Sequence, residues 1–197
     1  RVRLMTEDDQ IMIRIQNGES SAFAELVGRY QEPLIGFFVR NICDVQLAED
    51  LTQETLLRVF NQSWDYLPSG RFRGWMYRIA RNLMIDNIRR QSHDALIKAV
   101  KAKPNSDDDF LARLSGEMLP PGESASFREL SQIVDELLTE IPEEQRTTFV
   151  LHHLSGLTLT EVAEAMDTTL PTSKSRLRLA REKLREKLQR RGVTAPD

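Results

Sequence analysis

A helical pattern with a strongly basic end runs through IPEEQRTTFVLHHLSGLTLTEVAEAMDTTLPTSKSRLRLAREKLREKLQRR, from Ile141 to Arg191. Within this segment, a short amphipathic run from Thr160 to Met166 predicts one helix. Asp167 begins a turn, and Pro171 is suited to open a second helix at its first position. Two short helices joined by a tight turn are typical of a helix-turn-helix, whose second helix lies in the major groove of DNA.

The second helix of this motif carries a large positive charge. Between Pro171 and Arg191 there are nine Lys or Arg and two acids, Glu182 and Glu186, so the net charge is +7. A local excess of this size is typical of a surface that binds a phosphate backbone. The alternative is a solvated helix whose cations only stabilise its C-terminal end. The turn in front of the helix favours the first interpretation.

The rest of the chain separates its charges in the same way. It has 197 residues, enough for one large domain or two small ones, and a net charge of -3. Residues 71–90 carry six Arg and one Asp, a net charge of +5, whereas residues 105–145 carry eleven acids and two Arg, a net charge of -9. Such blocks predict two basic surfaces joined by an acidic segment.

The cysteine content and the apolar runs indicate the expected compartment. Cys43 is the single cysteine and cannot form an intramolecular disulfide. No secretory signal pattern is found, and no apolar run approaches the roughly 18 residues that a membrane span needs. We therefore expect a cytoplasmic protein with no membrane insertion of its own.

The N-terminal part predicts helices that share one core. Thr6, followed by three acids, is suited to cap a first helix, and Gly18 is expected to end it. A second helix is expected over Ser21–Ile42, where apolar residues recur at steps of three and four. Pro33 lies inside this segment and should bend or break the helix.

A third helix is expected over Val45–Trp64, capped by Asp44. Its inward side is predicted to hold Leu47, Leu51, Val59 and Phe60. Another side is polar and consists of Gln46, Asp50, Gln53, Glu54 and Asn61. A polar helix side is usually just solvated, and a surface that docks a partner is the sharper alternative.

A loop and a basic helix follow. Residues 65–70 read DYLPSG, a loop by its Pro and Gly, and residues 71–90 read RFRGWMYRIARNLMIDNIRR. Aromatic side chains interleaved with cations suit single-stranded nucleic acid, because unstacked bases lie on aromatic faces while Arg neutralises phosphates. Packing of Trp75 at the core, at helical spacing from Ile79, is the alternative reading of the same letters.

The helical pattern fails near Ser92, and linker composition follows to about Ser126, with Phe110–Leu114 as a short apolar segment inside it. Helices are then expected from Ser126 through Leu138 and over Glu143–Leu154, with Gly156 ending the latter. We predict an all-α protein of two small helical domains joined by a flexible acidic linker. The expected bounds are residues 6–92, 93–126 for the linker, and 127–191.

Four segments of the chain resemble one known family in their order and spacing. They are AEDLTQET at Ala48–Thr55, FRGWMYRIARN at Phe72–Asn82 with Asp86 and Arg89-Arg90 following, IPEEQR at Ile141–Arg146, and SGLTLTEVAEAM leading to KSRLRLAREKL at Lys174–Leu184. Together they are similar to the extracytoplasmic-function (ECF) sigma factors, the minimal two-domain members of the sigma-70 family. The resemblance covers about Phe23–Arg90 and Leu130–Leu188.

This resemblance implies a partner for each surface. The polar side of the third helix would dock on core RNA polymerase through Asp50, Gln53 and Glu54. The loop and basic helix would melt the -10 promoter element and hold an extruded base, which implies contacts from Tyr66, Arg71, Trp75, Arg78, Asn82, Asp86, Arg89 and Arg90. The helix-turn-helix would read the -35 element through Thr172, Ser173, Lys174, Arg176, Arg178 and Arg181.

The resemblance also implies an anti-sigma factor as a partner, and no catalytic residue, metal or cofactor, since the phosphodiester chemistry would belong to the polymerase. Many relatives have Gly where Asp167 and Pro171 stand, and an apolar residue at Ser173. Asp tolerates a left-handed turn and Pro suits a helix start, so the fold should survive these departures. The polar Ser173 makes the promoter sequence less predictable.

Other functions are open to the same sequence. A stand-alone helix-turn-helix repressor or activator would use the same reading helix but would bind duplex DNA tightly by itself. A metal sensor or enzyme would rest on His152, His153, His93 and Cys43, but adjacent His residues point about 100° apart on a helix, and no H-E-x-x-H or C-x-x-C spacing exists. The acidic linker is expected to be a plain tether, with mimicry of nucleic acid as the alternative.

Overall fold

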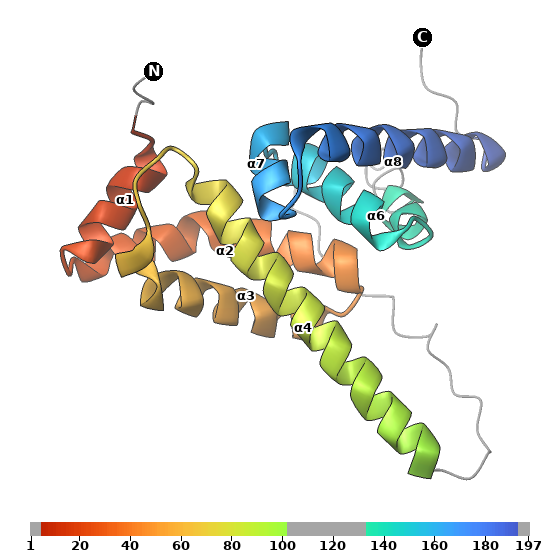
Figure 1. Ribbon diagram of the computed structural model, residues 1–197, viewed down its shortest axis with the longest axis horizontal. Coiled ribbons are helices and arrows are strands. Elements are labelled where there is room, and N and C mark those ends of the chain that lie inside the picture. The colour runs from red at the N-terminus through yellow and green to blue at the C-terminus, as the bar shows by residue number, and fades with distance from the viewer. Residues whose placement is uncertain (1–4, 102–132, 193–197) are drawn as a thin grey trace.

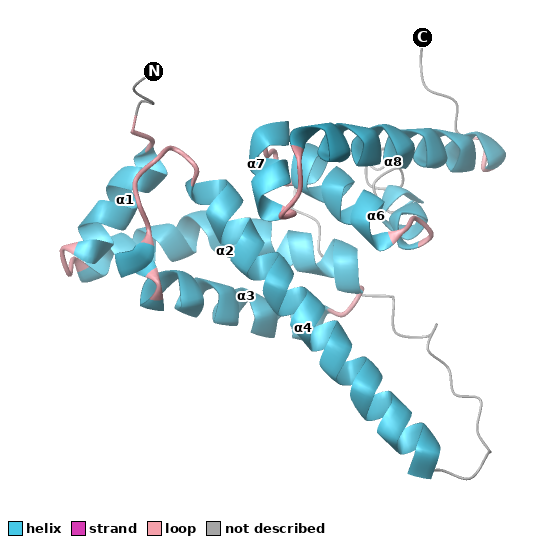
Figure 2. Ribbon diagram, viewed as in Figure 1, coloured by secondary structure: helices cyan, strands magenta, loops and turns pink. Residues whose placement is uncertain are grey.

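The computed structural model describes residues 5–101 and 133–192, and within these ranges it contains helices and turns and no strand (Figures 1 and 2). The predicted all-α class is therefore confirmed for the described residues. Most of the expected linker, residues 93–126, lies outside them, as do the apolar segment Phe110–Leu114 and the helix start expected at Ser126.

The first two helices begin as predicted. Helix α1, Glu7–Gln16, is capped by Thr6, whose hydroxyl accepts from the backbone N–H of Asp9 at 3.2 Å. Helix α2, Ser20–Ile42, runs through Pro33 without interruption, so the predicted break is wrong. The carbonyl that Pro33 leaves without a helical donor belongs to the exposed Arg29, where water can bond it, while buried neighbours hold the helix on the core.

Helix α3, Val45–Asn61, is shorter than predicted. Asp44 caps it by accepting from the N–H of Leu47 at 3.1 Å, as expected. A single 3₁₀ turn, η1 at Ser63–Asp65, follows instead of further α-helix. Phe60 was expected to face inward, but 43% of its surface is exposed, and its ring packs against Phe23 at the edge of the core with ring centroids 4.8 Å apart.

Helix α4, Phe72–Lys101, continues well past Ser92, where the sequence pattern fails. Its C-terminal part extends away from the other helices in Figure 1. Apolar periodicity marks only the side of a helix that packs on a core, so it is a poor guide to where a helix that extends away from the other helices ends.

The C-terminal part consists of a helix over residues 133–139, α6 at Glu143–Phe149, η3 at Val150–Leu154, α7 at Leu159–Ala165 and α8 at Leu170–Arg190. The single helix expected over Glu143–Leu154 thus changes character at Val150. There it widens to a π turn, in which the N–H of Ser155 donates to the carbonyl of Val150 at 2.8 Å. Gly156 then ends the helix with a φ of +67°, as predicted.

The two helical groups pack against each other. Helix α7 lies on α4, and α6 and η3 contact α2, so that the buried apolar residues of both groups form one continuous cluster (Figure 1). Inside this interface the hydroxyl of Thr147 donates to Oδ1 of Asn41 at 2.8 Å, and both residues are buried. At its edge the Arg40 guanidinium donates to the Asp135 carboxylate at 3.1 Å.

The close approach of α4 to α7 depends on Gly74. A Cβ atom at this position would lie 3.0 Å from Oε2 of Glu164 and 3.3 Å from the carbonyl oxygen of Glu161, so a side chain would push the helices apart. Beside it, the Arg73 guanidinium donates to the carbonyls of Ser155 and Gly156, the latter at 3.1 Å. Contacts of this kind fix the orientation of the two groups.

Candidate nucleic-acid and polymerase interfaces

The helix-turn-helix is held by local contacts. Thr158 and Glu161 form a capping box at the start of α7, and Asp167 takes the turn with a φ of +50°, as expected for a residue that tolerates the left-handed region. Thr169 caps α8 by accepting from the N–H of Thr172 at 3.3 Å. Helix α8 begins at Leu170, so Pro171 stands at its second position rather than its first.

Ser173 does not belong to the surface that faces DNA. Its exposed fraction is 0%, and it lies on the buried face of α8 with Leu177, Ala180 and Leu184, at steps of four, three and four residues. This face packs on the rest of the C-terminal group, so the predicted contact of Ser173 with DNA is corrected to a packing role. Because Ser is polar, the sequence alone did not indicate that this position is buried.

The cations of α8 divide between two faces. On the face toward the body of the protein, three cations of α8 and its C-cap pair with acids that precede the helix-turn-helix: Arg176 with Glu144 at 2.5 Å, Arg191 with Glu136 at 2.7 Å, and Lys187 with Glu140. Arg176, which was predicted to touch DNA, is thereby engaged within the protein, with its side chain 20% exposed. The net charge of +7 therefore overstates what this helix offers to DNA.

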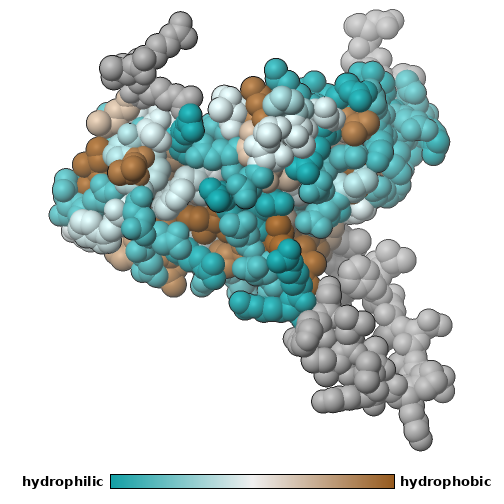
Figure 3. Space-filling model, viewed as in Figure 1, coloured by the Kyte–Doolittle hydropathy of each residue, from teal (hydrophilic) through white to brown (hydrophobic). Residues whose placement is uncertain are grey.

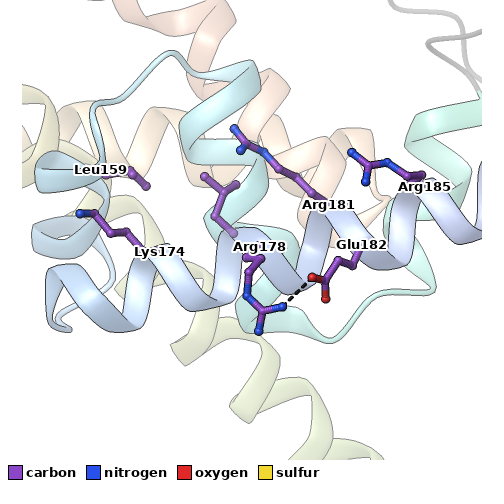
Figure 4. Close-up of a pocket in the computed structure, with 7 residues that line it drawn as sticks. Leu159, Lys174, Arg178, Arg181, Glu182 and Arg185 are labelled. Atoms are coloured by element: carbon purple, nitrogen blue, oxygen red, sulfur yellow. Dashed lines mark hydrogen bonds and ion pairs between the residues drawn. The ribbon is translucent and has the colours of Figure 1, made fainter. Parts of the chain in front are cut away.

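The other face forms a cationic stripe. It consists of Lys174, Arg178, Arg181 and Arg185, all exposed and spaced by four, three and four residues (Figure 4). With Leu159, Leu177 and Glu182 these side chains line an open groove. Arg185 was missed in the sequence, although its spacing from Lys174 is a detectable signal. A row of cations on one helix side suits a phosphate backbone.

Neighbours hold two members of the cationic stripe. The Arg178 guanidinium pairs with the Glu182 carboxylate at 2.5 Å (Figure 4). The Nε–H of Arg181 donates to Nε2 of His153 at 3.0 Å, which requires an unprotonated nitrogen there. Burial, the Arg181 charge and His152 lower the pKa of His153, so the ring is neutral at pH 7 and able to accept.

Tyr66 was predicted to contact the -10 element, but only 4% of its surface is exposed. Its hydroxyl donates to Oδ1 of Asp9 at 2.5 Å, and its ring packs on Phe72 and Trp75 with centroids 5.7 and 5.0 Å away. Burial, and then the Asp9 carboxylate, raise the pKa of Tyr66. Its role is corrected to anchoring the loop, and Trp75 lies half-buried at the core edge, in line with the packing alternative.

The remaining residues expected at the -10 element are accessible. Arg78, Asn82, Asp86 and Arg89 share one exposed side of α4, with Arg71 before the helix and Arg90 beside Arg89. Arg78 lies 3.6 Å from the Asp167 carboxylate in the helix-turn-helix, so this side of α4 begins at the contact between the two helical groups.

Two large exposed apolar side chains were not predicted as site residues from the sequence. Trp64 is 72% exposed and Leu67 is 78% exposed, and both belong to the segment between α3 and α4. Figure 3 shows separate patches of brown, apolar surface among hydrophilic residues on this face of the molecule, including at its left-hand end. Their exposure could have been predicted from their position close to Pro68 and Gly70, because large apolar residues in a loop often stay outside the core.

The polar side of α3 is accessible as expected. Asp50 and Gln53 are exposed, and Glu54 is half-buried and accepts from the Arg58 guanidinium at 2.8 Å. Exposed Leu57 and Phe60 continue the same side of the helix. A groove between α3 and α4 is lined by Leu51, Glu54, Arg58, Leu83, Asp86, Asn87 and Arg90.

The histidine pair has other partners. His152 Nδ1 lies 2.8 Å from the carbonyl oxygen of Leu157, and His153 accepts from Arg181. Within residues 5–101 and 133–192, no group of three or more His, Cys, Asp or Glu is placed to hold a metal ion. In the same part of the chain, no helix is both long and apolar enough to cross a membrane.

Family models match both helical groups. The model of sigma-70 region 2 matches residues 26–107, and the model of sigma-70 region 4 matches residues 131–184. The polar side of α3, the loop and α4 thus fall within the first model. The helix-turn-helix falls within the second.

Curated relatives match the chain over nearly its whole length. It is 30% identical over 176 residues to the ECF RNA polymerase sigma factor SigW of Bacillus subtilis, covering 89% of this chain and 94% of SigW. It is 29% identical over 187 residues to the RNA polymerase sigma-H factor of Pseudomonas aeruginosa, covering 93% of this chain and 94% of the relative.

Solved structures share the fold. CnrH, in a complex with the cytosolic domain of CnrY, superposes with a TM-score of 0.65 at 22% identity, covering 92% of this chain and 97% of CnrH. The sigma factor RpoE of Bartonella quintana, in a complex with the anti-sigma factor NepR, gives a TM-score of 0.68 at 20% identity, covering 85% of this chain and 96% of RpoE.

Proposed function

We propose that this chain, which belongs to the extracytoplasmic-function sigma factors of the sigma-70 family, reads the -35 and -10 elements of its promoters. We further propose that it helps to separate the DNA strands. As an alternative sigma factor it directs transcription initiation by core RNA polymerase. One observation carries the proposal: both sigma regions occur in order on one chain, and each presents accessible cationic residues.

We assign the -35 element to the cationic stripe of α8. Lys174, Arg178, Arg181 and Arg185 reach the phosphate backbone or base edges when the N-terminal part of α8 enters the major groove. Thr172 lies at the start of the helix and is half-buried. Arg176 contributes only if its pair with Glu144 opens.

We assign the -10 element to the loop before α4 and to the exposed side of α4. Trp64 and Leu67 offer apolar faces to unstacked bases, and Arg71, Arg89 and Arg90 offer charge to the strand. Extruding a base costs a few kcal/mol, which stacking and hydrogen bonds to the base edge offset.

The two helical groups separate when the promoter is bound. The -35 and -10 elements lie about 25 base pairs apart, or about 85 Å along the duplex. In the packed protein the Arg78 guanidinium lies 3.6 Å from the Asp167 carboxylate and joins the exposed side of α4 to the helix-turn-helix, so we propose that this contact opens when both elements are read. Core polymerase is the partner whose binding energy offsets the loss of the interface.

We assign polymerase docking to the exposed side of α3. Gln53→Ala and Glu54→Ala should each weaken binding to core polymerase, measured by fluorescence anisotropy with labelled protein, because both side chains lie on that side. Gln10→Ala, an exposed glutamine on α1, is the matched control. Unchanged affinity in both α3 variants removes the docking assignment.

The remaining parts of the proposal follow from family membership. The protein acts in the cytoplasm, where core polymerase lies, and the phosphodiester chemistry belongs to the polymerase rather than to this chain. An anti-sigma factor is proposed as its regulator, since the fold matches the sigma factor RpoE solved with the anti-sigma factor NepR. We divide the chain into a region 2 domain, residues 6–92, and a region 4 domain, residues 127–191.

A gel shift with promoter duplex, in the presence and absence of core polymerase, tests the proposal. We expect a sequence-specific complex only when both the protein and core polymerase are present. Tight, sequence-specific binding by the isolated chain would instead identify a stand-alone helix-turn-helix regulator.

A further inference from the structure

The loop between α3 and α4 lies at the surface and yet carries large apolar side chains. It exposes Trp64 and Leu67 to solvent, although large apolar side chains gain nothing from water. An irregular segment of this length also loses conformational entropy when it is ordered. The ordered conformation of the loop therefore needs stabilising contacts, and these come from α1.

Asp9 ties the loop to the start of α1. Its carboxylate accepts from the N–H of Thr6 at 2.9 Å, from the hydroxyl of Tyr66 at 2.5 Å and from the N–H of Gly70 at 2.9 Å. The side chain is completely buried. Burial raises the pKa of Asp9, but the hydrogen bonds from Tyr66, Thr6 and Gly70 outweigh it and leave the pKa below its ordinary value. The anion is therefore the form that binds the loop.

Gln16 holds the other end of the same loop. Its amide nitrogen donates to the carbonyl of Ser63 at 2.7 Å and to the carbonyl of Tyr66 at 2.9 Å. These residues flank Trp64, and Tyr66 directly precedes Leu67. Asp9 and Gln16 lie seven residues apart, which places them on one side of α1. Helix α1 thus hydrogen-bonds to the loop at both of its ends, and the side chains of Trp64 and Leu67 stay exposed to solvent.

We infer that α1 is a positioning element for promoter opening. Asp9 and Gln16 order the loop before DNA binds, so that Trp64 and Leu67 contact the separating strand without a further loss of conformational entropy in the loop. The inference rests on the proposed -10 function of the loop. Neither Asp9 nor Gln16 touches DNA, and both act through the loop backbone and Tyr66. A pre-ordered binding segment gains affinity because its entropy is lost during folding.

Holoenzyme reconstituted with core polymerase tests this role. The variants are Asp9→Asn and Gln16→Leu, with Asp8→Asn and Gln10→Leu as matched controls on the same helix. The hydrogen bonds of Asp8 go to Tyr30 and Arg29 rather than to the loop, and Gln10 is exposed. Strand opening is followed by 2-aminopurine fluorescence in the -10 element of a linear promoter, and hydrogen exchange reports the order of residues 63–70.

Both Asp9→Asn and Gln16→Leu should lower the extent of opening about tenfold, the effect of losing a buried hydrogen bond to a charged group or two neutral ones. Exchange in residues 63–70 should quicken, while affinity for core polymerase and the salt dependence of promoter binding stay unchanged. Both controls should open promoters as the wild type does. Gln16→Leu keeps the test valid should Asp9→Asn fold poorly.

Wild-type opening in the two variants would overturn the inference, as would an equal loss in Asp8→Asn, which would show a general stability effect. A double variant, Trp64→Ala with Leu67→Ala, separates this outcome from failure of the proposed function. Wild-type opening by that double variant would remove the loop from the -10 assignment. Loss of opening in it, beside normal Asp9→Asn and Gln16→Leu, would leave the function intact and refute only the role of α1.

Discussion

The division of α8 into two cationic faces makes a prediction that charge alone does not. Replacing Arg178 and Arg185 with Ala removes two cations from the stripe. Replacing Lys187 and Arg191 with Ala removes the same charge from the other face, where Glu140 and Glu136 hold both side chains. The two double variants have equal net charge, and only the first should weaken contact with DNA phosphates.

The expected size follows from counterion release. Each phosphate contact contributes about 0.9 to the slope of log affinity against log salt. Loss of two contacts lowers the slope by about 1.8, and over a fourfold rise in salt this corresponds to about a 12-fold difference in affinity. The wild-type holoenzyme should therefore lose about 12-fold more affinity than the Arg178→Ala, Arg185→Ala variant between about 50 and 200 mM salt.

Holoenzyme binding to a fluorescent promoter duplex, measured by anisotropy at several salt concentrations, gives the slopes directly. Contacts made by the polymerase are common to all samples and cancel in the comparison. The Lys187→Ala, Arg191→Ala control should keep the wild-type slope and show a slightly lower melting temperature. Equal slopes in the two double variants would refute the assignment of the stripe to DNA.

Three further predictions concern stability. Thr147→Val should lower the free energy of unfolding by about 1–3 kcal/mol in urea titration, because it leaves buried Asn41 without its donor across the interface, and a loss below about 0.5 kcal/mol would contradict that role. Gly28→Ala should stabilise the protein by about 0.5–1 kcal/mol, because Ala favours a helix and the new Cβ would lie in open space. Gly74→Ala should not stabilise it, because the new Cβ would press on Glu161 and Glu164 of α7. Equal effects of the two substitutions would refute the close packing of α4 on α7. The pKa of Asp9 is lower in the folded chain, so its contribution is present above its ordinary pKa of 3.8 and is lost as pH falls through the folded value. The stability gap between wild type and Asp9→Asn should therefore shrink as the pH falls below 3.8 and through the folded pKa, and a constant gap would contradict the shift.

Local signals in the sequence predicted local structure well. The caps at Thr6 and Asp44 and the left-handed turn at Asp167 depend on residues within a few positions, and all three are confirmed. The helix-turn-helix was also predicted, since its helices and turn are contiguous. Exposure of the polar side of α3 followed from helical spacing alone.

Long-range contacts explain what the sequence did not predict. Tyr66 is buried because its hydroxyl meets Asp9, 57 residues earlier in the chain. Ser173 is buried because its helix position, and not its polarity, sets its environment. The two faces of α8 differ because acids from other helices reach only one of them. No periodicity in the sequence reports such pairings.

In vitro transcription with purified core polymerase across a promoter library tests most directly whether this chain selects promoters. The account predicts discrete start sites that appear only when both the protein and core polymerase are present. It further predicts that these start sites share sequences at the -35 and -10 positions. Transcripts that start at the same places without the protein, or no specific transcripts with it, would contradict the account.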